Sequence, residues 1–385
     1  MKNNITSSLI ILGNGFDLNC GLKSKFSDFF KTKKLEIKNA SDTYTNSVCS
    51  NIWYLLLYFA YFDNFYYDGE SKRFVERIKN DDPLWMNVEG FIKKIVATSK
   101  EDNDWMNRHL PIASQNYCGY LYRIFISREN SYVIGERNQI SSLKKHFNFY
   151  FNNSVTINIY DYLYEELLKF EEDFKNYLVT QINNSKNYKS NYDLLLSKIT
   201  KEKKEFFSII SFNYTGFLGN AGSEAFLKDF YNIHGSLSNN IIIGFDSSDI
   251  GEKYYNSIKM CKAWQKMNSL ESQYQLPKRE NIDTIKFYGH SLGKQDYSYF
   301  HAMFDYYDIY NSTIKLVFYY TEYGKKEKEN QEIRNTFITQ VYSLLNDYAI
   351  KSGNESIVRT IVSRLQLENR LFIYPIEKLE NEKQL

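Results

Sequence analysis

The stretch that most constrains the fold lies near the N-terminus, where a short apolar run leads into two glycines separated by one residue. It reads Ser8-Leu9-Ile10-Ile11-Leu12-Gly13-Asn14-Gly15-Phe16-Asp17-Leu18. Four consecutive aliphatic residues bounded by a glycine turn predict a buried strand. Because glycine has no Cβ atom, backbone amides in such a turn can approach a phosphate closely. The third glycine of the dinucleotide fingerprint is absent, since Gly21 comes too late, so the motif is also compatible with a plain tight turn.

Composition narrows the class of protein. The 385 residues allow a sizeable core and two or three domains by length. A formal net charge of +2, with Lys and Arg scattered among Asp and Glu, gives no electrostatic case for nucleic-acid binding. Four isolated cysteines, with no Cys-x-x-Cys and no Cys/His pair at ligand spacing, are typical of buried thiols in a reducing compartment rather than of a zinc site. We therefore expect no metal ion.

Targeting signals are not apparent in the sequence. The N-terminal apolar run is shorter than the core of a signal peptide, and it leads into a motif rather than a cleavage site. The apolar block 52–62 is about half as long as a membrane span and is followed by Asp63. We therefore expect a cytoplasmic protein without a membrane partner.

The two halves of the chain differ in character. From about residue 31 to 202 helical spacing predominates, most clearly over 162–181, and an aromatic helix is expected over 52–67. After Lys204, β-rich runs alternate with helical patterns such as 297–307 and 332–349. The predicted strands after Lys204 are 206–213, 229–234, 240–245, 283–288 and 314–320.

Strands that alternate with helices predict an α/β fold with a Rossmann-like, mainly parallel sheet. We expect residues 1–30 and 203–376 to form this nucleotide-binding core. Residues 31–202 would be a large helical insertion and 377–385 a C-terminal tail.

Polar residues follow the predicted strands, at the edge where a parallel sheet binds ligands. Any one of them is also an ordinary turn or cap residue, so their joint placement carries the argument. His234 is the candidate of most interest, because a histidine beside Gly235 at a strand end can take a proton near neutral pH. The other candidates are Asn14, Asp17, Asn213, Asp246 and Asp296.

A second histidine, His290, precedes Ser291 in Gly-His-Ser-Leu-Gly, which fits the Gly-x-Ser-x-Gly pattern of hydrolase elbows. In that fold an acid and then a histidine follow the serine. The only later histidine is His301, ten residues on and inside the next predicted helix. A serine hydrolase is therefore disfavoured.

Several motifs together resemble the AbiH family of bacterial phage abortive-infection proteins. They are Gly13-Asn14-Gly15-Phe16-Asp17-Leu18, Trp85 with Glu89, Phe212-Asn213-Tyr214-Thr215, Asn232-Ile233-His234-Gly235-Ser236, and Gly289-His290-Ser291-Leu292-Gly293 followed by Asp296. Their order and spacing extend from about residue 8 to 320. The resemblance implies a cytoplasmic antiphage defence protein and leaves the biochemical activity open.

A more distant resemblance is to sirtuins and sirtuin-like defence proteins, in which a glycine turn, a strand-end Asn and a His-Gly pair follow in order. Gly13-Asn14-Gly15, Ser211-Phe212-Asn213 and His234-Gly235 match that order. The resemblance implies that Asn213 holds the ribose or an attacking water and that His234 is the base. It further implies an NAD or related nucleotide site lined by Gly13, Asn14, Gly15, Phe16, Asp17, Gly244, Asp246, His290, Ser291 and Asp296.

The departures from sirtuins decide which chemistry to expect. Thr215 stands where sirtuins carry an acidic residue, and the zinc-binding cysteines are missing, so deacylation is disfavoured. Hydrolysis of NAD needs only electrostatic stabilisation of a ribosyl cation and an attacking water. We therefore expect antiphage defence through binding and hydrolysis of NAD or a related nucleotide.

Two other functions stay open at the level of sequence. One is a nucleotide-sensing module without turnover, in which His234 is structural. The other is a metal-dependent nuclease that uses Asp17, Asp246 and Asp296, although the charge balance argues against it. A phage-derived trigger and a homo-oligomer are further partners that this sequence allows.

Overall fold

The computed structural model describes residues 7–41, 48–62, 65–68, 73–76, 88–90, 92–93, 96, 159–200, 205–246, 257–269, 274–324 and 326–379. The chain forms two compact units. The first comprises Met1–Ser24, Leu178–Ile241 and Leu270–Leu385. The second comprises Lys25–Tyr177 and Ile242–Ser269.

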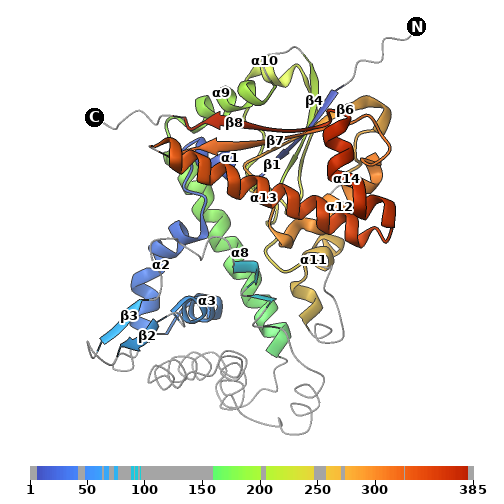
Figure 1. The fold of residues 1–385 in the computed structure, drawn as a ribbon. Coiled ribbons are helices and arrows are strands. Elements are labelled where there is room, and N and C mark those ends of the chain that lie inside the picture. The colour runs from blue at the N-terminus through green and yellow to red at the C-terminus, as the bar shows by residue number, and fades with distance from the viewer. Residues whose placement is uncertain are drawn as a thin grey trace. The chain divides into compact units, whose positions relative to one another are not determined.

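A six-stranded, all-parallel sheet lies at the centre of the first unit (Figure 1). Its spatial order is β5-β4-β1-β6-β7-β8, which is 3-2-1-4-5-6 when the six strands are counted along the chain. This is the order of the doubly wound Rossmann fold, so the predicted α/β fold with a mainly parallel sheet is confirmed. The strands are β1 (Ser7–Leu12), β4 (Phe206–Ser211), β5 (Leu227–Asn232), β6 (Ile282–Tyr288), β7 (Lys315–Glu322) and β8 (Leu371–Glu377).

Strand β1 is buried on both faces, which explains its continuous apolar sequence. Leu9 and Ile11 face a core formed with α12 (Tyr297–Tyr307), α13 (Glu327–Lys351) and α14 (Glu355–Leu367). Ile10 and Leu12 face the opposite core, formed with α1 (Asn14–Asn19) and α9 (Tyr188–Thr200). The sheet is thus covered by helices on both faces (Figure 1).

The second unit has an aromatic core. Phe29 of α2 (Phe26–Ser41) and Tyr54 of α3 (Ile52–Phe62) contact the ring of Phe170, with centroids 5.8 and 5.7 Å away. Phe170 lies on α8 (Ile159–Asn184), where buried Glu166 accepts a hydrogen bond of 3.2 Å from the amide of Ile52. This bond satisfies a donor at the start of α3. The unit also holds β2 (Phe65–Asp68), β3 (Arg73–Glu76) and α11 (Lys262–Asn268).

Some predicted elements are wrong. The expected strand 240–245 forms only isolated bridges, Gly235 with Ile241 and Phe245 with Cys261. The amide of Ile243 donates to the buried carboxylate of Glu171 (2.6 Å) rather than to a neighbouring strand. The expected helix 52–67 ends at Phe62, and β2 follows it.

Other elements lie elsewhere than predicted or were missed. The first helix begins at Asn14, directly after the glycine turn. The sequence did not indicate α9 or β8. Much of the predicted helical insertion 31–202, including Trp85, lies outside the described residues.

The unit boundaries can be compared with the predicted domains. Helix α9 falls in the predicted insertion 31–202, yet Tyr188, Tyr192 and Leu195 pack in the core of the first unit with Leu12 and Phe16. Residues 242–269, expected in the Rossmann-like core, belong to the second unit. Strand β8 extends to Glu377, the first residue of the predicted tail.

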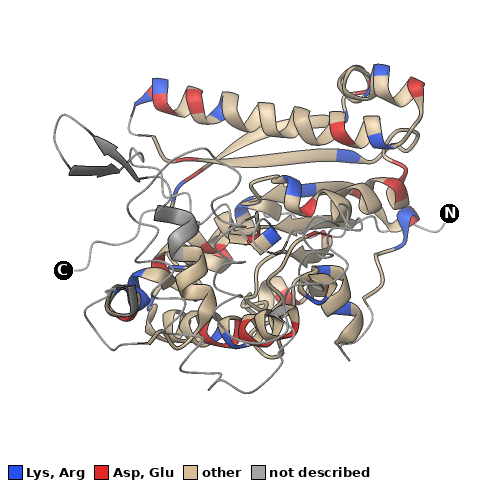
Figure 2. Ribbon diagram, turned by 90° about the horizontal axis from the view of Figure 1, so that it is seen from below, with Lys and Arg blue, Asp and Glu red and all other residues tan. Residues whose placement is uncertain are grey.

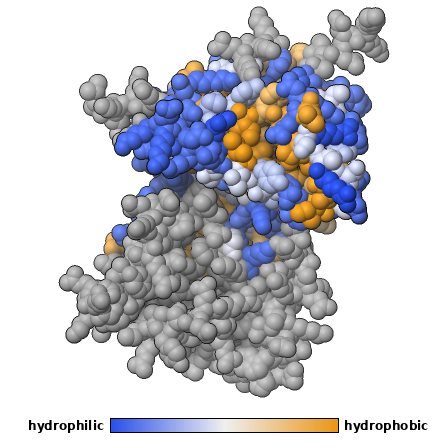
Figure 3. All heavy atoms as spheres, viewed as in Figure 1, coloured by the Kyte–Doolittle hydropathy of each residue, from blue (hydrophilic) through white to orange (hydrophobic). Residues whose placement is uncertain are grey.

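Surface charge in the described residues is mixed. Lys and Arg alternate with Asp and Glu along the helices (Figure 2). Apolar side chains also reach the surface of the first unit, where Tyr342, Ile350 and Leu367 are 56%, 59% and 88% exposed, and Figure 3 shows apolar residues among hydrophilic ones. No helix within the described ranges combines the length and the apolar character that crossing a bilayer requires.

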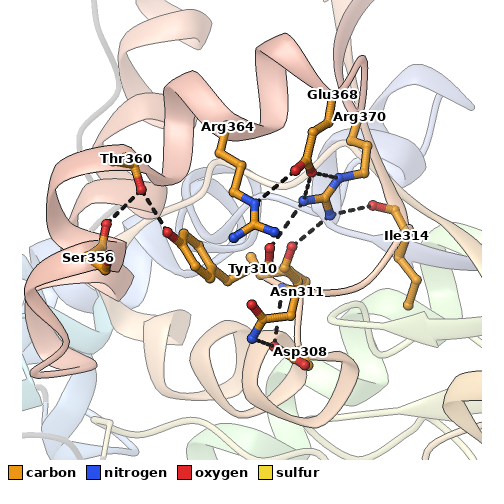
Figure 4. A network of polar contacts seen from close by, with 10 residues as sticks. Asp308, Tyr310, Asn311, Ile314, Ser356, Thr360, Arg364, Glu368 and Arg370 are labelled. Atoms are coloured by element: carbon orange, nitrogen blue, oxygen red, sulfur yellow. Dashed lines mark hydrogen bonds and ion pairs between the residues drawn. The ribbon is translucent and has the colours of Figure 1, made fainter.

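A buried guanidinium fixes the start of β8 (Figure 4). Arg370 is 4% exposed and donates to the backbone oxygens of Ile309 (2.8 Å), Ile314 (3.3 Å) and Tyr310 (3.3 Å). Its Nε also donates to Glu368 (2.8 Å). Since three carbonyls depend on one side chain, Arg370 holds the connection before β7 against the start of β8.

Substituting Arg370→Leu is expected to lower the free energy of unfolding by about 3 to 5 kcal/mol, because it leaves buried carbonyls without donors. Chemical denaturation measures this loss. The matched control is Arg359→Leu, because Arg359 is 76% exposed and pairs with an exposed Glu355, and its effect is expected to stay within about 0.5 kcal/mol. Equal losses in the two variants would contradict the role given to Arg370.

Candidate functional site

The glycine turn after β1 is packed backbone against backbone. The amide of Gly13 donates to Tyr288 O (3.0 Å), and the amide of Gly15 donates to Gly289 O (2.7 Å). A Cβ atom on Gly13 would lie 2.5 Å from the Cα atom of His290, and one on Gly15 would lie 2.8 Å from the Cα atom of Gly289. Both glycines are therefore required by the close approach of β1 and β6 at the topological switch point of the sheet. A phosphate at this turn would have to compete with these backbone bonds.

Asp17 and its neighbours in the turn have protein partners. Asp17 is 2% exposed and accepts hydrogen bonds from the hydroxyls of Tyr188 (2.7 Å) and Thr215 (2.9 Å). The side chain of Asn14 exchanges hydrogen bonds with Ser24. Phe16 is buried among Tyr192 and Tyr288. Asp17 thus joins α1, α9 and the segment after β4.

Burial raises the pKa of Asp17 from 3.8 to about 6. The folded protein therefore holds this proton more tightly than the unfolded chain. The protonated Asp17 therefore raises the free energy of unfolding below about pH 4. This contribution is lost as the pH rises through about 6. Two pKa units correspond to about 3 kcal/mol.

The substitution Asp17→Asn is expected to remove this dependence on pH. From about pH 4 to about pH 7.5 the wild-type free energy of unfolding should fall by about 2 kcal/mol relative to that of the variant. Denaturant titrations of both proteins at several pH values measure the difference. Other titrating groups, including the buried Glu171, cancel in it. A difference that does not change with pH, or that changes in the opposite direction, would contradict a raised pKa for Asp17.

Asn213 connects the ends of three strands. Its Nδ2 donates to Gly13 O (3.1 Å), and its backbone oxygen accepts from Asn232 Nδ2 (2.7 Å). The same amide of Asn232 also donates to Thr215 O (2.9 Å). The Oδ1 atom of Asn213 is buried and has no hydrogen-bond partner among the described residues. A buried acceptor of this kind fits a hydroxyl or water donor from a ligand.

Two histidines share one carboxylate at the ends of β5 and β6. The Nε2 atom of His234 lies 3.0 Å from Oδ1 of Asp296, and the Nε2 atom of His290 lies 3.2 Å from Oδ2. The side chains of both histidines are 5% exposed, and that of Asp296 is 15% exposed. Each histidine ring is thus oriented by one oxygen of the same carboxylate, which is the arrangement that prepares an imidazole for acid–base work.

Aromatic rings enclose the two histidines. The ring of Phe212 lies edge-on to His234 (5.4 Å between centroids) and to His290 (4.7 Å). Tyr299 lies 5.5 Å from His234, and Phe300 lies 4.9 Å from His290. Because apolar surroundings weaken screening by water, the hydrogen bonds to Asp296 are stronger here than in solvent.

The pairing of β4 with β5 brings Asn213 beside His234. Ser211 is opposite Asn232 in the parallel register. Asn213 comes two residues after Ser211, and His234 comes two residues after Asn232. The amide of Ile233 donates to Ser211 O (2.8 Å) and continues the pairing beyond the strands. The structure therefore brings together Asn213, His234, His290 and Asp296.

A family model described as "Bacteriophage abortive infection AbiH" matches residues 9–320. The chain belongs to the AbiH family. The match extends from β1 into β7 and contains every strand end described above. No curated protein and no solved structure matches the chain, so the resemblance to sirtuins has no support from these comparisons. Membership supports a role in phage abortive infection.

Two predicted site residues of this AbiH chain lie in the second unit. A Cβ atom on Gly244 would lie 2.2 Å from Met260 O, so the glycine is required locally. Asp246 is buried. Glu89, one of the motif residues, pairs with the buried Lys262 (2.7 Å). A nucleotide-binding role for Gly244 and Asp246 stays a prediction.

Among the described residues, Ser291 makes no hydrogen bond with the neighbouring base His290. Its residue is exposed, whereas His290 directs Nε2 at Asp296 and accepts a hydrogen bond on Nδ1 from the amide of Leu292 (2.9 Å). Both nitrogens of His290 are thus engaged by groups other than the Ser291 hydroxyl, which leaves the serine without the neighbour that would activate it.

Two of the three carboxylates proposed as nuclease ligands are engaged by other side chains. Asp17 is enclosed by Tyr188 and Thr215, and Asp296 faces two histidines. Among the residues that the structure describes, no group of three or more His, Cys, Asp or Glu side chains is arranged to hold a metal ion.

Sequence reasoning missed some residues of the site. Tyr188, the donor to Asp17, and Tyr299, beside His234, were not among the predicted site residues. Asp296 was expected to line a pocket, whereas it contacts both histidines. Its position in the conspicuous Gly-His-Ser-Leu-Gly-x-x-Asp stretch was the available signal.

Proposed function

We propose that this AbiH protein acts in antiphage defence by binding and hydrolysing NAD or a related nucleotide, with His234 as the base. The observation that carries the proposal is the hydrogen bond between His234 and Asp296, beside Asn213 at the carboxyl ends of β4, β5 and β6. The Rossmann order of the sheet supports a nucleotide, because such sheets bind ligands at this edge.

In the proposed reaction the bond between the ribose C1′ and the nicotinamide nitrogen breaks, and nicotinamide leaves as a neutral molecule with the bonding electron pair. Water attacks the cationic C1′, and His234 takes its proton. The products are nicotinamide, ADP-ribose and one proton. Asp296 stabilises the imidazolium that forms, and the buried Oδ1 of Asn213 accepts a hydrogen bond from a ribose hydroxyl or from the attacking water.

Product analysis with the purified full chain tests this proposal. Incubation with NAD, with and without lysate from phage-infected cells, is expected to release nicotinamide and ADP-ribose in equal amounts. Lysate is included because an enzyme that consumes a common metabolite has to be restrained before infection. Absence of both products under every condition would overturn the hydrolysis.

A nucleotide-sensing module without turnover is the second candidate, because the Rossmann strand order supports nucleotide binding whether or not His234 acts as a base. It predicts that NAD raises the melting temperature of the protein while no product forms. Thermal denaturation in the same samples separates this candidate from hydrolysis.

A further inference from the structure

The segment 289–293 forms a turn that places a backbone amide against the ring of His290. Gly289 and Leu292 both adopt positive φ, +72° and +51°, and this turn brings the amide of Leu292 to 2.9 Å from His290 Nδ1. For a non-glycine residue such as Leu292 this backbone conformation is uncommon. The turn therefore holds an amide donor against one chosen nitrogen of His290.

This contact fixes the proton of His290. A backbone N–H only donates, so Nδ1 of His290 has to accept and carries no proton. The imidazole is then neutral with its proton on Nε2, and that N–H donates to Oδ2 of Asp296 (3.2 Å). If Nδ1 of His290 also carried a proton, this N–H would point at the backbone N–H of Leu292, and the two donors would repel each other. For the same reason the Nε2 atom of His290 is unsuited to bind a metal ion.

The fixed proton of His290 constrains the hydrogen bonds of its neighbours. Asp296 accepts from His290 on one oxygen, and its other oxygen faces Nε2 of His234 at 3.0 Å. An ionised carboxylate only accepts hydrogen bonds, so Nε2 of His234 carries a proton. In the neutral ring the basic atom of His234 is then Nδ1.

We infer that His290 is a positioning residue that sets, through Asp296, the tautomer of His234 and so makes Nδ1 the basic atom. This inference rests on the proposed function for its effect on rate, and on hydrogen-bond geometry alone for its effect on the tautomer. In this role His290 acts on His234 through Asp296. Its role is to keep Asp296 aligned with His234.

Nitrogen NMR of the full chain, with histidine as the only labelled residue type, tests the tautomers directly. The protein has five histidines, so the signals can be assigned by single substitutions. The spectra are expected to show His290 and His234 both protonated on Nε2. A proton on Nδ1 of His234 in the wild type would overturn the inference, whether or not the protein hydrolyses NAD.

Two variants at position 290 test the roles of the two ring nitrogens of His290 separately. His290→Gln keeps an amide donor where Nε2 stands, whereas His290→Asn keeps an acceptor near the Leu292 amide and loses the donor to Asp296. His290→Gln is expected to retain the His234 signals. His290→Asn is expected to shift the His234 signals and to slow release roughly tenfold or more.

The readouts distinguish the two ways of failing. The wild type could release no nicotinamide while the His234 signals are retained in His290→Gln and shifted in His290→Asn. In that case the proposed NAD hydrolysis fails and the tautomer inference stands. If His290→Asn remains folded and leaves the His234 signals unchanged, the inference is overturned. Should His290→Asn not fold, the wild-type spectrum and His290→Gln still decide the question.

Discussion

Gly289→Ala is expected to lower the free energy of unfolding of the first unit by about 3 to 5 kcal/mol. A Cβ atom at this position would lie 2.3 Å from the amide nitrogen of Phe16 and 2.8 Å from Gly13 O. These are backbone atoms of the turn after β1 and cannot move without breaking the bond from Gly15 N to Gly289 O. The positive φ of Gly289 adds strain for any other residue.

Two other glycines serve as matched controls. Gly353 has a similar φ of +66°, but a Cβ atom there would meet nothing within 4 Å, so Gly353→Ala is expected to cost about 1 kcal/mol. Gly216 has neither the conformation nor the contact, and Gly216→Ala is expected to stay within about 0.5 kcal/mol of the wild type. Chemical denaturation of the three variants measures the cost of the positive φ and, separately, the cost of the backbone contact. A cost for Gly289→Ala no larger than that for Gly353→Ala would contradict the backbone contact between β1 and β6.

Asp296→Asn is expected to slow nicotinamide release by about 10² to 10⁴ while leaving the protein folded. The amide can accept on its oxygen only, so its NH₂ group faces the Nε2–H of one histidine. That histidine then turns or changes tautomer. Release rates together with circular dichroism separate this effect from unfolding. A folded variant with wild-type release would contradict the role of the shared carboxylate.

The parts of the fold that were predicted correctly depend on local sequence. The apolar run 8–12 belongs to a strand buried on both faces, and the apolar pattern of 297–307 coincides with α12. The order of the six strands could not be predicted, because it depends on pairing between strands far apart in the sequence and on β8, which was not recognised. In the same way, local propensity gave no sign that residues 240–245 would form bridges only.

The candidate site was predictable as a set of residues but not as a set of contacts. Strand-end position singled out Asn213, His234 and Asp296, and the Gly-His-Ser-Leu-Gly pattern drew attention to His290. The contact between His234 and Asp296 depends on how residues 289–296 turn, and the positive φ of Leu292 is not encoded by any glycine or asparagine. The glycine turn was misleading in the opposite way, because Gly13 and Gly15 fit a phosphate loop by sequence. In the structure the space beside them is occupied by Gly289, which is 276 residues from Gly13 and 274 residues from Gly15.

Nicotinamide release by the purified wild type and by His234→Ala, measured side by side with NAD in excess, tests the central proposal most directly. The wild type is expected to release nicotinamide under activating conditions. The variant, with its fold verified, is expected to release it about 10² to 10⁴ times more slowly, because the base is missing. Equal release by a folded His234→Ala, or no release by the wild type, would contradict the proposal.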